Sequence, residues 1–150
     1  MNTKTTNKLY RLPFYLIGIT LIILGPIWIF MDEPWMFDQV ANEAALGTSF
    51  EELLNAEINH SLPDYLRIIY TWFGLWVTSL GVMIVLNIHF LDINNHKAKN
   101  IFSFVTGLFL LVSVFLGYTT IPESPFIFVI WVLIIVYLAG MFTTFRKTTM

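Results

Sequence analysis

Four blocks of apolar residues, each about 20 residues long, limit what this sequence can fold into. They cover residues 12–31, 66–90, 101–120 and 125–145, and none has a charge in its middle. A helix of about 20 apolar residues crosses the roughly 30 Å hydrocarbon core of a bilayer. Apolar residues make up 57% of the chain and charged residues only 12%. We therefore predict an all-α integral membrane protein, a four-helix bundle forming a single domain over residues 1–150.

The charges between the blocks predict an orientation. Nine of the ten acidic residues lie on one side of the predicted membrane, with Arg67 as the only basic residue there. The other seven basic residues lie on the opposite side: Lys4, Lys8, Arg11, Lys97, Lys99, Arg146 and Lys147. Since basic residues collect on the cytoplasmic side of a membrane, we expect both termini to be cytoplasmic.

Residues 32–65, between the first two blocks, predict an extracytoplasmic lid of two short amphipathic helices. Asp38 is placed to cap the first helix, and Gly47 is a natural stop for it. Ser49 stands three residues before Glu52, which is the spacing of a capping box. We expect the lid to roof the outer mouth of the bundle with its carboxylates in water.

The second apolar block has one polar face and the third has one face of small residues. At about 100° per residue, the polar face contains Asp64, Arg67, Thr71, Gly74, Thr78, Gly81, His89, Asp92 and His96. The face on the third block contains Ser103, Thr106, Gly107, Ser113 and Gly117. Small residues let membrane helices approach closely, so we expect these two helices to pack along the two faces. Either the polar face is only a helix contact, or its outer end forms a pocket for a small or lipid-like molecule beneath the lid.

Arg67 is the reason to consider a pocket. An arginine near the start of a spanning helix is costly unless it is paired or reaches water. It forms either a structural ion pair, with Asp64 or an acid of the lid, or a contact with an anionic or carbonyl group of a ligand. The candidate ligand-binding residues are Arg67, Tyr70, Asp64, Thr71 and Gly74.

His89, Asp92 and His96 share one helix face and are weak candidates for metal ligands. The other interpretation is a solvated helix end, since Asn94 and Asn95 favour an end of the helix before His96.

Other classes of functional site lack the residues that they require. The chain has no cysteine for a disulfide or thiolate site, no ionisable group near the membrane midplane for ion-coupled transport, no nucleophile or phosphate motif, and too few basic residues to bind nucleic acid.

The segment DYLRIIYTWFGLWVTSLG, residues 64–81, resembles the start of the second helix in the DoxX-like group of small bacterial membrane proteins. Gly25-Pro26 near the end of the first block is also similar, whereas the lid is longer than is usual in that group. The resemblance implies a four-helix bundle in a bacterial inner membrane. Some members are associated with quinone-linked sulfur oxidation, so the resemblance makes quinone a possible cofactor. The positions it singles out are Asp64, Arg67, Tyr70 and Gly74.

No residue is predicted to be catalytic, which favours a non-catalytic accessory subunit or a binder of a lipid-like molecule. One alternative is a membrane subunit of a quinone-dependent oxidoreductase, in which Arg67 and Tyr70 hold the quinone head. Another is a module that binds a protein partner through the acidic lid. Membrane lipids are expected partners in each case. The small-residue face of residues 103–117 could serve an internal contact or a homo-oligomer.

Overall fold

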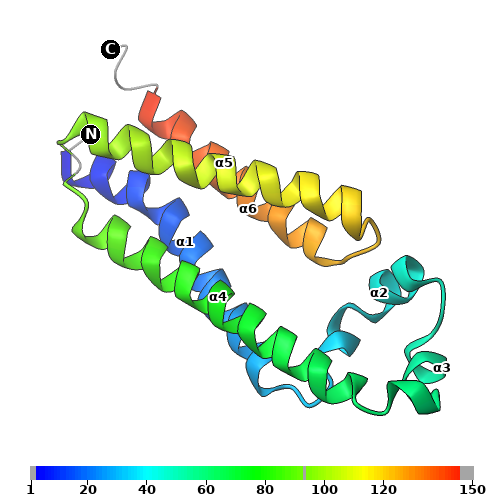
Figure 1. Cartoon of the computed structure of the whole chain (residues 1–150). Coiled ribbons are helices and arrows are strands. Elements are labelled where there is room, and N and C mark those ends of the chain that lie inside the picture. Colours follow the sequence, from blue (N-terminus) through cyan, green and yellow to red (C-terminus); the bar gives the residue numbers. More distant parts are fainter. Residues whose placement is uncertain (1–2, 93, 146–150) are drawn as a thin grey trace.

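The structure, a computed structural model, describes residues 3–92 and 94–145. Arg146 and Lys147, which the orientation argument uses, lie outside this range. The described chain is all-helical and has no strand. Its elements are α1 (Thr3–Phe30), the 3₁₀ helix η1 (Pro34–Asp38), α2 (Gln39–Leu46), α3 (Phe50–Asn55), the 3₁₀ helix η2 (Glu57–Asn59), α4 (Leu62–Phe90), α5 (His96–Thr120) and α6 (Phe126–Phe145) (Figure 1).

Three helices are long and apolar enough to cross a membrane: Asn7–Phe30 within α1, Leu62–Phe90 and His96–Thr120. The fourth predicted block is helical too, but its apolar run over the described side chains, Phe126–Phe142, is shorter. The protein is thus an all-helical protein with three helices of membrane-spanning length and composition.

Helix α1 is the centre of the arrangement, because α4 and α6 both pack against it. Helix α5 packs chiefly against α6. The prediction that the second and third blocks pack along their polar and small faces is therefore wrong. Gly74 and Gly81 of α4 instead face Gly25 and Gly18 of α1. Within each helix the two glycines are seven residues apart, which is about two helical turns, so both lie on the same face of their helix.

The glycines of α5 face α6. A Cβ on Gly107 would lie 2.8 Å from the Tyr137 hydroxyl, and one on Gly117 would lie 3.0 Å from Ile127 Cγ1. The Tyr137 hydroxyl also donates to the Ser103 carbonyl at 2.8 Å. The small face of α5 thus makes an internal contact, with a different helix from the one predicted.

The apolar core lies toward the end of the bundle at which α1 begins. Tyr10, Phe14 and Ile17 of α1 are almost completely buried there. The Tyr10 hydroxyl lies 2.9 Å from Ser103 Oγ and donates to the Lys99 carbonyl at 3.2 Å, which ties α1 to α5. This end is held by both apolar packing and hydrogen bonds.

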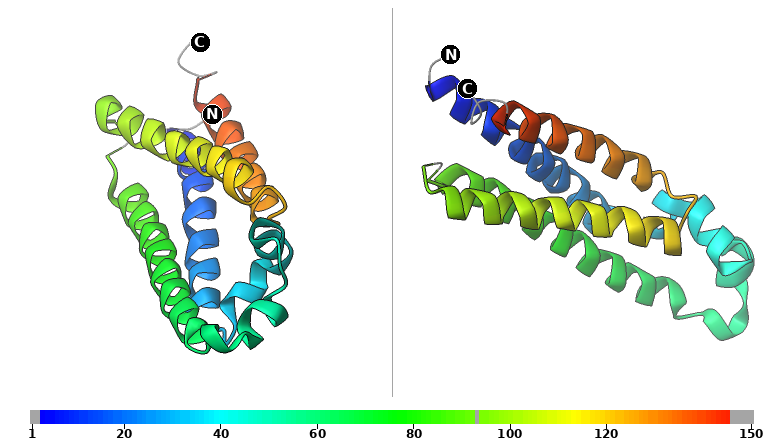
Figure 2. Two further views of the ribbon diagram at one scale, coloured as in Figure 1. Left: turned by 45° about the vertical axis from the view of Figure 1, so that its right-hand side comes forward. Right: turned by 90° about the horizontal axis from the view of Figure 1, so that it is seen from above.

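The two helix pairs, α1–α4 and α5–α6, separate toward the other end, where η1, α2 and α3 lie (Figures 1 and 2). We call residues 31–61 the lid, since α4 begins at Leu62. Two local predictions for the lid are confirmed. Gly47 ends α2 in the left-handed conformation, with φ +70°, and Ser49 Oγ caps α3 by accepting from the Glu52 amide at 3.1 Å.

Candidate functional site

The lid is attached to the bundle by an aromatic cluster around Trp28 of α1. The Trp28 ring lies 5.7 Å from Phe37 of η1, 5.0 Å from Phe73 of α4 and 4.9 Å from Phe126 of α6, measured between ring centroids. Trp28 is only 5% exposed. Aromatic pairs at these distances add about 0.5–1.5 kcal/mol beyond the apolar area that they bury. The lid is therefore a packed part of the structure rather than a loose loop.

Two polar contacts fasten the lid to different helices. Ser124, just before α6, donates to Asp38 Oδ2 at 2.8 Å. The Asn42 side chain of α2 donates to the Tyr70 hydroxyl of α4 at 3.1 Å and to the Trp35 carbonyl at 3.2 Å. Asp38 thus stands at the N-cap of α2 but makes no capping bond, which corrects the predicted role. The Asp38 carboxylate instead accepts the hydrogen bond from Ser124, which is distant in the sequence.

Arg67 lies in the second turn of α4 and pairs with Asp32, the second residue after α1. The Nη2–Oδ1 distance is 3.4 Å, and the two side chains are 56% and 93% exposed. An ion pair this exposed contributes about 0–1 kcal/mol. Arg67 also borders a hollow of about 360 Å³, which it lines with Ile68, Thr71 and Trp72. The guanidinium is therefore held weakly at the edge of a mostly apolar surface.

The five predicted binding residues do not form one pocket. Arg67 and Thr71 line the hollow on α4, whereas Tyr70 turns to Asn42 in the lid. Gly74 is buried against α1. In the described part of the chain, the exposed carboxylate of Asp64 makes no hydrogen bond or ion pair. The structure thus gives different neighbours to residues that the helical periodicity placed on one face.

The predicted metal ligands are also apart. The structure brings His89 Nδ1 to 3.0 Å from the Tyr15 hydroxyl, and Asp92 Oδ1 accepts from the Asn94 amide at 3.0 Å. His96 begins the next helix, α5, after Asn95 caps it. Within residues 3–92 and 94–145, no three His, Cys, Asp or Glu side chains are grouped closely enough to hold a metal ion.

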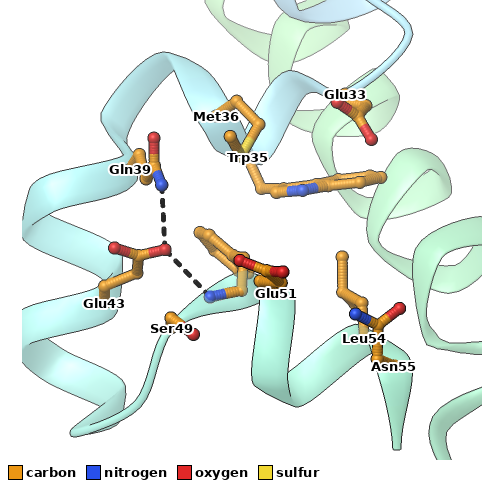
Figure 3. A pocket seen from close by; sticks show the side chains of 10 residues that line it. Glu33, Trp35, Met36, Gln39, Glu43, Ser49, Glu51, Leu54 and Asn55 are labelled. Atoms are coloured by element: carbon orange, nitrogen blue, oxygen red, sulfur yellow. Dashed lines mark hydrogen bonds between the residues drawn. The ribbon is translucent and has the colours of Figure 1, made fainter.

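A second hollow, of about 460 Å³, lies within the lid itself (Figure 3). Glu43 stands on one wall, and its Oε1 accepts from Gln39 Nε2 at 2.9 Å and from the Phe50 amide at 2.9 Å. The hydrogen bond from Gln39 and then that from the Phe50 amide lower the pKa of Glu43 below its ordinary value. Glu43 thus joins α2 to α3 and stays ionised at neutral pH.

Sequence reasoning missed Asp38, Ser124 and Asn42 as the residues that fasten the lid. Ser124 has no sequence signal, because its partner is 86 positions away. Asn42 has no sequence signal either, because its partner Tyr70 is 28 positions away.

No protein-family model, curated protein or solved structure matches this chain.

Proposed function

We propose that this protein is a non-catalytic, four-span integral membrane protein that binds a lipid-like anion at the Arg67 hollow. Both termini would be cytoplasmic, in a bacterial inner membrane, with the lid on the opposite face. The observation that carries the binding proposal is the position of Arg67, beside the mostly apolar hollow near the start of a helix of membrane-spanning length.

The surroundings of Arg67 match the two parts of a lipid. Trp72 and Ile68 are 58% and 57% exposed and offer apolar surface to an acyl chain. A guanidinium binds phosphate or carboxylate oxygens through parallel hydrogen bonds. Its present partner, Asp32, lies at the long distance of 3.4 Å and is almost fully exposed. An anionic head group could therefore replace Asp32 at small energetic cost.

Purification in a mild detergent, followed by mass spectrometry of bound lipids and quinones, tests the binding proposal. Arg67→Ala should lose most of the co-purifying anionic lipid, and Arg67→Lys should keep part of it, because lysine retains the charge without the planar fork. Asp32→Asn is the matched control, since it removes the same ion pair but leaves the cation. It should keep or gain lipid. The proposal fails if all three variants carry the same lipids as the unmodified protein.

The four spans and their orientation can be tested separately, because the chain has no cysteine of its own. Single cysteines at Glu57, Glu123 and Asn94 occupy exposed positions in the lid and in the two connections. In intact cells a membrane-impermeant maleimide should label the first two and should reach the third only after permeabilisation. Labelling of Asn94→Cys in intact cells would contradict the topology.

A further inference from the structure

Two polar side-chain atoms are buried in the lid without a hydrogen-bond partner. They are Nε1 of Trp35 and Oδ1 of Asp38, and both residues belong to η1. Trp35 is 3% exposed and Asp38 is 8% exposed. Among the residues that the structure describes, no other buried side-chain nitrogen or oxygen is left unpaired. Buried polar groups are nearly always hydrogen-bonded, so two exceptions in one short helix need an explanation.

Asp38 carries the larger cost, because it is a carboxylate. Its Oδ2 accepts from the Ser124 hydroxyl at 2.8 Å, which is the only hydrogen bond of this carboxylate group in the described chain. The one ion pair within residues 3–92 and 94–145 joins Arg67 to Asp32, so no described cation offsets the charge of Asp38. A carboxylate taken out of water needs a cation or several donors to recover the cost of burial. Burial of Asp38 therefore opposes closure of the lid.

Aromatic packing favours closure. The Phe37 ring of η1 lies 5.7 Å from Trp28 of α1 and 5.2 Å from Phe126 of α6, measured between ring centroids. These contacts, together with the bond between Ser124 and Asp38, hold the lid against both helix pairs at the end where the pairs separate (Figure 2). The closed position is thus a balance between favourable apolar packing and unfavourable burial of two polar atoms.

We infer that the lid is a gate, which opens when Asp38 parts from Ser124. In the open state η1 and α2 move away from the segment before α6, and water reaches the Asp38 carboxylate and the Trp35 N–H. The ends of the helix pairs beneath the lid are then uncovered. This gate does not depend on lipid binding at the Arg67 hollow, because neither Asp38 nor Ser124 lines that hollow.

Thiol labelling measures the opening, since the chain has no cysteine of its own. Ala41 is 1% exposed and lies three residues after Asp38, hence on the same side of the lid, whereas Ala44 is exposed. In the full-length protein in detergent, a water-soluble maleimide should label Ala41→Cys about 10- to 1,000-fold more slowly than Ala44→Cys, as for a side chain uncovered in a minor state. Equal rates would mean that the lid is not closed. Absence of labelling at Ala41→Cys short of global unfolding would mean that it does not open. Either result overturns the inference.

Two substitutions made together with Ala41→Cys should change the labelling rate in opposite directions. Ser124→Ala removes the hydroxyl donor and should speed labelling by about tenfold or more. Asp38→Asn has the same shape and keeps an acceptor for Ser124 but removes the buried charge, so it should slow labelling by about tenfold. If Asp38 only fastened the lid, its replacement would speed labelling instead. Faster labelling in Asp38→Asn would therefore overturn the gate.

Glu57→Gln is the matched control, because it removes a lid charge at an exposed position. It should leave the rate at Ala41→Cys unchanged. Ala44→Cys, labelled in each variant, corrects for changes in the intrinsic reactivity of the thiol, and circular dichroism checks that each variant is folded. Equal slowing by Glu57→Gln and Asp38→Asn would mean that labelling follows the net charge of the lid rather than burial of Asp38, which also overturns the inference.

Discussion

Replacement of Gly81 by alanine tests the packing of α1 on α4 most directly. A Cβ at this position would lie 2.6 Å from the Gly18 carbonyl oxygen and 2.9 Å from the Ile22 amide nitrogen. Both are backbone atoms of α1, and ordinary contact begins near 3.4 Å. No side-chain rotation relieves such a clash, so the two helices must move apart.

The expected loss of stability follows from two opposing effects. Overpacking costs about 1–3 kcal/mol, and a clash with backbone belongs near the upper value. Replacing glycine by alanine inside a helix returns about 1 kcal/mol through helix propensity. We therefore expect Gly81→Ala to lower the free energy of unfolding by about 2 kcal/mol, which is about 30-fold in the equilibrium constant.

Unfolding by SDS in mixed micelles, followed by circular dichroism, measures this difference. Gly117→Ala is the matched control, because its Cβ would meet only the flexible Ile127 side chain, at 3.0 Å and beyond. It carries the same helix-propensity gain of about 1 kcal/mol without the backbone clash, so it should leave stability unchanged or raise it by up to about 1 kcal/mol. If Gly81→Ala unfolds at the same SDS fraction as the unmodified protein, the close contact between α1 and α4 is wrong.

Two further predictions concern the two ends of the bundle. Tyr10→Phe should destabilise the protein by about 1 kcal/mol, because it removes the hydroxyl bonded to Ser103 of α5; the exposed Tyr65→Phe should have no effect in the same SDS titration. The two hydrogen bonds that lower the pKa of Glu43 stabilise the lid only while the carboxylate is ionised, so this contribution is present above pH 4.5 and is lost as the pH falls through the lowered value. Hydrogen exchange of the Phe50 amide should therefore lose protection at acid pH, and Glu43→Gln should remove that pH dependence. A pH profile unchanged in Glu43→Gln would assign the effect to another group.

The sequence predicted local features well because they depend on neighbouring residues. Long apolar blocks can form little except helices in a membrane. Gly47 and Ser49 end and begin helices that are next to them in the sequence. Asp38 was assigned the wrong role because a capping rule considers only nearby amides. Its actual partner, Ser124, becomes a neighbour only after the chain has folded.

The choice of helix partners failed for a different reason. Small residues on two helices permit close packing but do not determine which helices meet, and the prediction pairs helices that are consecutive in the chain. Gly18 and Gly25 of α1 have the same seven-residue spacing as Gly74 and Gly81 of α4. This match was present in the sequence and would have indicated the correct pair. The two hollows could not be predicted, since each depends on how side chains of separate turns or segments lie after folding.

The central position of α1 has a consequence for biosynthesis. A chain is made from its N-terminus, so α1 meets α4 early but waits for α6, which is translated last. Helix α5, which packs chiefly on α6, emerges before its main partner exists. The nascent protein therefore passes through a stage in which α1 and α4 are paired while the apolar surface of α5 still lacks its main partner. Substitutions on α6 that slow its docking, such as at Gly140 beside Pro13, would prolong the time for which the apolar surface of α5 is uncovered.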